Sequence, residues 1–162
     1  MNILFVCTGN TCRSSMAEGI LKFLLKENNI ENINVSSAGL SAFEGQRANE
    51  KAIDVLKNKG IDIKTHRSRQ LTEEIIKTSD LILTMTDSHK KLITNTLPEY
   101  SHKIYTLKEY ALKVNNESTE NTNIDIDDPY GMDMKTYEET SNEITEQLVK
   151  IIKTIDKQSS IY

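Results

Sequence analysis

Two thiols and an arginine lie within one short stretch, CTGNTCRS, near the N-terminus of the 162-residue chain. Cys7 and Cys12 are the only cysteines, five residues separate Cys7 from Arg13, and Ser14 follows directly. A thiolate is a strong nucleophile, and a guanidinium offers a planar pair of donors that matches two oxygens of a phosphate. The spacing therefore indicates a nucleophilic thiol set beside an anion-binding arginine.

The residues around this stretch predict a tight loop between a strand and a helix. NILFVC (2–7) is apolar without alternation, as in a buried strand, and apolar residues recur at helical spacing from Ser14 onward. Such a loop can direct backbone N–H groups and the helix dipole at one anion, and Gly9 allows a positive φ or a close backbone approach. These donors favour a thiolate at Cys7, and Ser14 can hydrogen-bond it or cap the helix. The residues predicted to bind the phosphate or the rest of the substrate are Thr8, Gly9, Asn10, Thr11, Cys12, Ser14 and, from a later segment, Tyr130.

A candidate proton donor lies in the segment DIDDPYG (125–131). Cleavage of a phosphate ester requires a proton for the leaving group. Asp128 precedes Pro129, which restricts the residue before it to extended conformations and so holds it on a stiff loop. From these residues alone, an Asp-Pro turn in a solvated acidic run is an equally good interpretation.

Strand and helix patterns alternate along the chain. The predicted strands are residues 2–7, 32–38, 79–86 and 102–110, the last running into a loop. The predicted helices begin at Ser14, span 49–60 with Gly60 at the C-terminal position, span 88–97 behind a cap at Asp87 or Ser88, and span 135 to about 157. Residues 113–133 are predicted to be irregular. We expect one α/β domain over 1–162: a doubly wound, four-stranded parallel sheet with helices on both faces and the phosphate-binding loop after the first strand.

The composition argues against a nucleic-acid-binding protein and against a membrane-spanning one. The net charge of −4 gives no basic footprint for nucleic acid, and no apolar run approaches the ~20 residues that span a bilayer. The N-terminus lacks signal-peptide features, so we expect a cytoplasmic monomer that binds neither nucleic acid nor membrane. The three histidines, His66, His89 and His102, lack ligand spacing, and we expect neither metal nor cofactor.

Several motifs together resemble one enzyme family. VCTGNTCRS and DPYG, with SSAGL (36–40), HRSRQL (66–71), DLILTM (80–85) and IYTLKEY (104–110), are similar to low-molecular-weight protein phosphatases over nearly the whole chain. The resemblance implies a phosphocysteine intermediate on Cys7, with Arg13 as phosphate ligand and Asp128 as general acid and then base. It also implies that four residues support the loop through hydrogen bonds: Asn10, Ser14, Ser37 and His66. For His66, an ordinary surface position is the alternative. Ser15 stands where the family usually has proline, which predicts an intact, slightly less rigid loop.

The family includes tyrosine phosphatases, arginine phosphatases and arsenate reductases, and three positions discriminate between them. Thr11 is small and polar where a phenyl ring would need an apolar wall, and Gly131 replaces the second of two adjacent aromatics. Asp128 can both protonate the leaving group and pair with a guanidinium. We therefore expect phosphorylated protein substrates, with phosphoarginine favoured and phosphotyrosine as the alternative. No cysteine follows Cys12, which disfavours arsenate reduction, and a non-catalytic phosphate-binding module would need neither nucleophile nor acid.

Cys12 is not needed for the displacement itself. It can form a disulfide with Cys7 under oxidation and so protect the nucleophile. The alternative is that Cys12 packs as a small apolar residue.

Overall fold

The computed structural model describes the backbone of residues 1–159 and the side chains of residues 1–155, so the last three residues of the predicted 1–162 domain lie outside it. The strands are β1 (Asn2–Cys7), β2 (Asn34–Gly39), β3 (Leu81–Thr84) and β4 (Ile104–Thr106). The helices are α1 (Arg13–Glu27), α2 (Glu50–Lys57), α3 (Glu73–Thr78), α4 (Asp87–Thr96), α5 (Leu107–Val114) and α6 (Met134–Ser159), with a 3-10 segment η1 (Pro98–Lys103).

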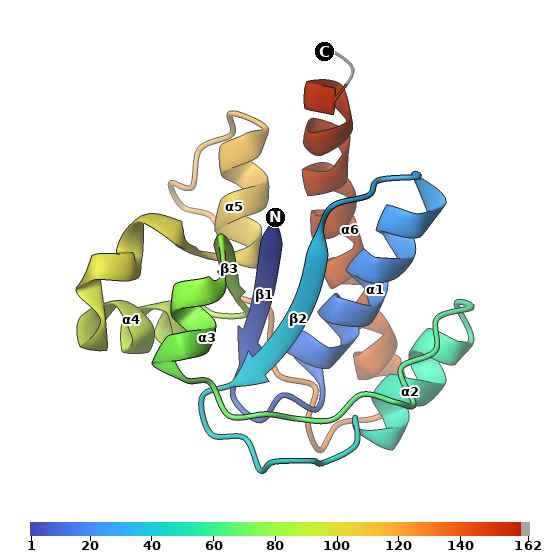
Figure 1. The fold of residues 1–162 in the computed structure, drawn as a ribbon. Coiled ribbons are helices and arrows are strands. Elements are labelled where there is room, and N and C mark those ends of the chain that lie inside the picture. The colour runs from blue at the N-terminus through green and yellow to red at the C-terminus, as the bar shows by residue number, and fades with distance from the viewer. Residues whose placement is uncertain (160–162) are drawn as a thin grey trace.

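The described strands form one parallel sheet in the order β2-β1-β3-β4. The chain runs from β1 to β2 on one side and then crosses to β3 and β4 on the other. Helices α1 and α6 cover one face, whereas α3 and α4 cover the other (Figure 1). The predicted doubly wound α/β fold is confirmed. The reversal of strand order falls beside β1, so the loop that follows Cys7 lies where such folds place ligands.

Strand β1 is buried on both faces of the sheet. Ile3 and Phe5 join a core with α1 and α6, whereas Leu4 and Val6 join a second core with α3 and α4. Successive side chains of a strand point to opposite faces, so a strand between two helical layers has no polar side. This explains the unbroken apolar run and makes β1 a rigid support for the loop.

The predicted strand over 102–110 is wrong beyond Thr106. Strand β4 is only three residues long, and helix α5 starts at Leu107. The Thr106 hydroxyl accepts a hydrogen bond from the Glu109 backbone amide, and the Glu109 carboxylate accepts one from the Thr106 backbone amide, at 3.0 Å each. This reciprocal capping box has a sequence signature, TLKE, that competes with the strand pattern and prevails.

Other differences concern the ends of elements. Helix α4 is capped by Thr86, whose hydroxyl accepts the His89 amide, and not by Asp87 or Ser88. The short helix α3 was not predicted from the sequence. Its N-terminus is capped by the Thr72 hydroxyl, which accepts a hydrogen bond from the Ile75 amide. Gly60 follows α2 with a φ of 77°, the left-handed conformation expected of a glycine there.

Candidate active site

The loop of residues 7–13 joins the end of β1 to α1 and surrounds the Cys7 sulfur. The backbone amide of Asn10 donates to Cys7 Sγ at 3.3 Å, and Ser14 Oγ lies 2.9 Å from the same sulfur. Cys7 and Ser14 are buried. Ser14 belongs to the first turn of α1, so the positive end of the helix dipole also faces the sulfur. The loop thus holds a thiol among donors at a helix N-terminus.

Asn10 fixes the shape of this loop. It is fully buried and has a φ of 58°, in the left-handed region that asparagine tolerates better than most residues. Its side-chain amide donates to Ser14 Oγ at 2.8 Å and to Ser37 Oγ at 2.9 Å. Neither feature that Gly9 allows is found there: the positive φ of the loop is at Asn10, and a Cβ on Gly9 would meet only Thr11 Oγ1, at 3.7 Å.

A second layer of polar residues lies behind the loop. His66 Nε2 is 2.7 Å from the Asn10 carbonyl oxygen, which makes it the donor, and His66 Nδ1 is 3.7 Å from Glu18 Oε2. The Ser37 hydroxyl donates to the same Glu18 oxygen at 2.5 Å. The structure thus places Ser37 and His66 where the sequence predicted supports of the loop. Glu18 was missed, since an acid on a helix gives no signal of what it faces.

Gly39 is a further residue that sequence reasoning missed. A Cβ added at Gly39 would lie 2.6 Å from the carbonyl oxygen of Thr8 and 3.0 Å from the Asn10 nitrogen. Real Cβ atoms do not approach backbone so closely, and backbone cannot move aside cheaply. The end of β2 therefore needs a glycine for the loop to pack against it.

Arg13 connects the loop to the segment that carries Asp128. The buried Arg13 guanidinium donates through Nη1 to the Ile126 carbonyl oxygen at 2.9 Å, and Nη2 lies 3.3 Å from Asp128 Oδ2. Asp128 Oδ1 accepts the Tyr130 amide at 3.1 Å, and about half of the Asp128 side chain is exposed. Arg13 Nε is buried without a protein partner among the described residues. This N–H therefore has no acceptor in the described part of the chain, which is unusual for a buried donor.

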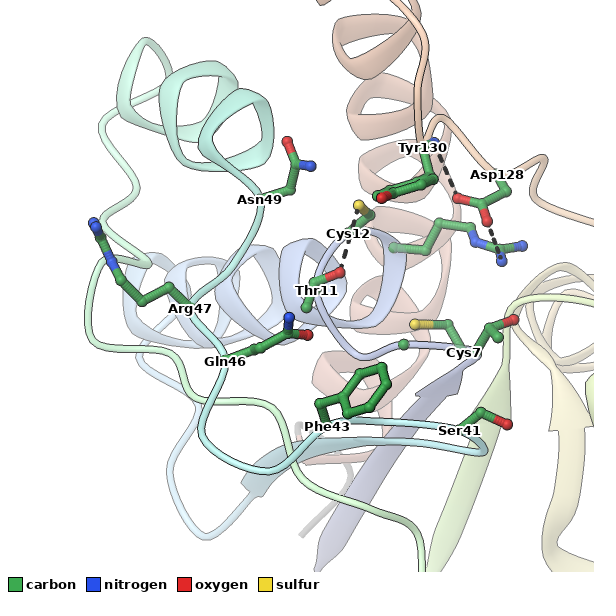
Figure 2. Close-up of a pocket in the computed structure, with 13 residues that line it drawn as sticks. Cys7, Thr11, Cys12, Ser41, Phe43, Gln46, Arg47, Asn49, Asp128 and Tyr130 are labelled. Carbon is green, nitrogen blue, oxygen red and sulfur yellow. Dashed lines mark hydrogen bonds and ion pairs between the residues drawn. The ribbon is translucent and has the colours of Figure 1, made fainter.

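A cavity of about 480 Å³ opens above the Cys7 sulfur (Figure 2). Phe43 and Tyr130, which are 75% and 70% exposed, are two of the residues that line it. Its other lining residues are Cys7, Thr8, Gly9, Thr11, Cys12, Arg13, Ser41, Gln46, Arg47, Asn49 and Asp128. Of the predicted site residues, Asn10, Ser14, Ser37 and His66 do not line the cavity. Residues 1–155 contain no cluster of three or more metal-ligating side chains.

Cys12 faces the cavity but is held by a buried phenol. Its sulfur lies 3.3 Å from the Tyr137 hydroxyl and 3.8 Å from Thr11 Oγ1. Burial raises the pKa of the Cys12 thiol, and the nearby Asp128 carboxylate raises it further. Burial and the contact with Cys12 also raise the pKa of Tyr137. Cys12 is therefore kept protonated, unlike a thiol prepared for attack.

His89, on α4, completes the surroundings of the loop. Its Nε2 lies 2.9 Å from Thr8 Oγ1, and its Nδ1 is buried without a partner in the described chain. Burial, reinforced by the positive charge of Arg13, lowers the pKa of His89 to about 4, although Asp128 and Asp125 act in the opposite direction. The sequence singled out His89 only as unsuited to metal binding. Its place beside the loop depends on the packing of α4, which no local pattern reports.

Comparison with known proteins agrees with this geometry. The family model described as low molecular weight phosphotyrosine protein phosphatase matches residues 2–161. A protein-arginine-phosphatase of Bacillus subtilis is 38% identical over 97% of this chain and 98% of its own. A solved structure of the YwlE arginine phosphatase, a mutant with a phosphorylated active-site serine, superposes with a TM-score of 0.87 at 36% identity and covers both chains completely.

The fold and the loop define a cysteine-dependent phosphatase class, and the chain belongs to the low molecular weight phosphotyrosine protein phosphatase family. Overall identity does not separate the activities within that family. A tyrosine phosphatase of T. tengcongensis is 42% identical, with a TM-score of 0.84 and coverage of 94% of this chain and 98% of its own. The choice of substrate therefore has to be argued from the cavity itself.

The buried His89 predicts an acid-sensitive fold. The unfolded chain binds this proton near its ordinary pKa of 6.5, whereas the folded protein binds it only near pH 4. The His89 contribution to stability is therefore fully present above about pH 6.5 and is lost as the pH falls from 6.5 to about 4, by about 3 kcal/mol in all. The free energy of unfolding, measured with urea at pH values from 8 to 4, reports this loss of stability. His89→Gln should remove this part of the decline, whereas His102→Gln, at an exposed histidine, should leave it in place; equal slopes in all three proteins would contradict the prediction.

The two thiols predict a reversible response to mild peroxide. Oxidation of Cys7 to a sulfenic acid, followed by attack of the Cys12 thiolate and loss of hydroxide, yields a Cys7–Cys12 disulfide. Because burial raises the pKa of Cys12, we expect this bridge to form faster as the pH rises from 7 to 9. Mass spectrometry with and without reductant measures it, and Cys12→Ser should accumulate irreversibly oxidised Cys7. Sulfonic acid at Cys7 beside a free Cys12 in the wild type would exclude the bridge.

Proposed function

We propose that this protein removes phosphate from phosphoarginine side chains of protein substrates. The observation that carries the proposal is a single cavity with Cys7 at its floor, Arg13 and Asp128 beside it, and the polar Thr11 in its wall. A binding module would need the donors of the loop but neither a nucleophile nor an acid. The family of the chain and its similarity to a protein-arginine-phosphatase support the same reaction.

The proposed reaction has two displacements at phosphorus. Cys7 Sγ attacks in line, the S–P bond forms, and the P–N bond to the arginine breaks while Asp128 gives its proton to the leaving nitrogen. Loop amides and the free Nε of Arg13 bind the equatorial oxygens of the phosphoryl group. Asp128 then takes a proton from water, whose oxygen displaces the sulfur and releases inorganic phosphate. The 3.3 Å ion pair with Arg13 supports this role, because it holds the acid at the edge of the phosphate site.

The preference for arginine rests on the walls of the cavity. Thr11 is half-buried in the wall, and its hydroxyl has only a weak 3.8 Å contact with Cys12 Sγ, which leaves it able to bond a guanidinium. Gly131 is exposed with a φ of 77°, so that side of the mouth has Tyr130 as its single aromatic. A nearby carboxylate, Asp128, can pair with the guanidinium.

A second candidate substrate is phosphotyrosine. One observation favours it: Phe43 and Tyr130 expose their rings on opposite sides of Cys7 in Figure 2, where they could flank a phenol. The aliphatic part of an arginine side chain can pack between the same rings. The aromatics therefore do not separate the two substrates, and Thr11 becomes the deciding position.

The proposal also covers the partners, the cellular location, the oligomeric state and the cofactors of the protein. A net charge of −4 supports a protein that acts without nucleic acid. We expect it to work as a cytoplasmic monomer on phosphorylated proteins, with no metal or cofactor. Within residues 1–159, every helix is too short or too polar to cross a bilayer.

Loss of the acid should slow chemistry much more than binding. For Asp128→Asn we expect kcat on a phosphoarginine peptide to fall by about 10²- to 10⁴-fold with little change in KM, because the leaving nitrogen then departs without its proton. The matched control is Asp127→Asn, which removes an exposed carboxylate one residue away and should retain turnover. Cys7→Ser should lose turnover and still bind inorganic phosphate. A kcat for Asp128→Asn close to that of the wild type would assign the acid elsewhere.

Thr11→Ile tests the substrate preference. In the wild type, kcat/KM should be higher for a phosphoarginine peptide than for a phosphotyrosine peptide of the same sequence. The isoleucine adds bulk and removes the hydroxyl, so the ratio should shift toward phosphotyrosine by about tenfold or more. Thr11→Val removes the hydroxyl at nearly constant size and separates the two effects. A wild-type preference for phosphotyrosine would show that the arginine assignment is wrong.

A further inference from the structure

The contact between Thr8 and His89 connects the loop after β1 to helix α4. Thr8 follows the nucleophile directly, is exposed and lines the cavity. His89 is 7% exposed and comes from α4, on the opposite face of the sheet from α1. The 2.9 Å distance between Thr8 Oγ1 and His89 Nε2 is the only side-chain hydrogen bond of Thr8 within the described residues.

The surroundings of His89 select one form of its ring. Nδ1 is buried with no partner in residues 1–155, so a hydrogen there would be a buried donor without an acceptor. A hydrogen on Nε2 instead meets the Thr8 oxygen. The charges that face the ring are the Arg13 cation, which opposes protonation, and the Asp125 and Asp128 carboxylates, which favour it. Burial lowers the pKa of His89 more than any of these charges, and Arg13 adds to it, so the ring is neutral, and the two contacts of its nitrogens favour a hydrogen on Nε2.

This tautomer determines what the Thr8 hydroxyl can do. A hydroxyl has one hydrogen to donate and two lone pairs. If His89 Nε2–H occupies one lone pair of Thr8 Oγ1, the hydroxyl hydrogen is free of any protein acceptor in the described chain. Since Thr8 lines the cavity beside Cys7, this hydrogen can serve whatever anion lies above the sulfur. The opposite tautomer would direct the hydrogen at the histidine and leave the cavity side with a lone pair, which repels an anion.

We propose that His89 is a positioning residue that orients the Thr8 hydroxyl, so that Thr8 donates a hydrogen bond to an oxygen of the bound phosphoryl group. Thr8 then adds a side-chain donor to the backbone amides and Arg13. This inference rests on the proposed phosphatase function and extends it. It also assigns α4 a role in the site: its packing sets the direction of a donor in the loop.

Inorganic phosphate is the probe for the first test, because it occupies the anion site without a leaving group. Calorimetric titration should show Thr8→Val binding phosphate about tenfold more weakly than the wild type, whereas Thr8→Ser, which retains the hydroxyl, should bind nearly as well. His89→Asn, whose amide is too short to reach Thr8, should lose a similar factor. His89→Gln places an amide N–H near the position of Nε2 and should recover most of the affinity. Equal phosphate affinity in the wild type and Thr8→Val would overturn the proposal.

Two further readouts separate positioning from a general loss of packing. The Thr8→Val/His89→Asn double variant should bind phosphate no more weakly than either single variant, because both remove the same hydrogen bond. Nitrogen-15 NMR of the wild-type histidines should show His89 neutral with its hydrogen on Nε2 from pH 5 to pH 8. Multiplied losses in the double variant, or a hydrogen on Nδ1, would each refute the inference. Failure of the wild type to hydrolyse any phosphopeptide would instead refute the proposed function, and the phosphate titration and the tautomer would still be measurable.

Discussion

The left-handed conformation of Asn10 is the constraint on which the site depends. Its amide donates to the Cys7 sulfur, its carbonyl accepts from His66, and its side chain bonds Ser14 and Ser37 and accepts the Arg69 amide. These partners come from the end of β1, the start of α1, strand β2 and the 66–69 segment. One residue therefore connects three other parts of the chain to the end of β1, which carries the sulfur. A loop held in this way keeps its donors directed inward before a ligand arrives, which avoids the cost of ordering them on binding.

The segment that carries Asp128, the proposed acid, is held to the fold by contacts of its own. Ile126 is fully buried, its amide donates to the Met85 carbonyl beyond β3, and its own carbonyl accepts Arg13 Nη1. One residue earlier, the Asp125 carboxylate accepts the Asp87 amide at the start of α4. An irregular segment is thus fastened to the same edge of the sheet as the nucleophile. The Arg13 guanidinium joins this segment to the loop, because it donates to the Ile126 carbonyl and pairs with Asp128, while its Nε has no partner in the described chain.

The sequence predicts those parts of the fold and site whose causes are local. The apolar run of β1, the helical period of α1 and the spacing of Cys7 and Arg13 are adjacent in the chain, so pattern alone places them. The same reasoning fails where a contact with a residue far away in the sequence determines the local structure. Gly39 is needed because the loop presses on β2, and the positive φ belongs to Asn10 because its side chain finds partners that Gly9 cannot have. At Thr106 a strand pattern competes with a local capping signal, and only the outcome of folding shows which one prevails.

Unpaired polar atoms give an independent indication of where this protein meets its ligand. Within the described residues, Arg13 Nε and His89 Nδ1 are the only buried side-chain nitrogen or oxygen atoms without a partner. Folding normally pairs such atoms, since an unmet donor costs about 1–3 kcal/mol. The two atoms differ in what they require. Arg13 Nε carries a hydrogen and lacks an acceptor, which the proposed substrate's phosphoryl group would supply, whereas His89 Nδ1 is left as a bare lone pair if the His89 hydrogen lies on Nε2. In the proposed reaction both exceptions would serve one anion, which Arg13 would bind directly and His89 would act on through Thr8.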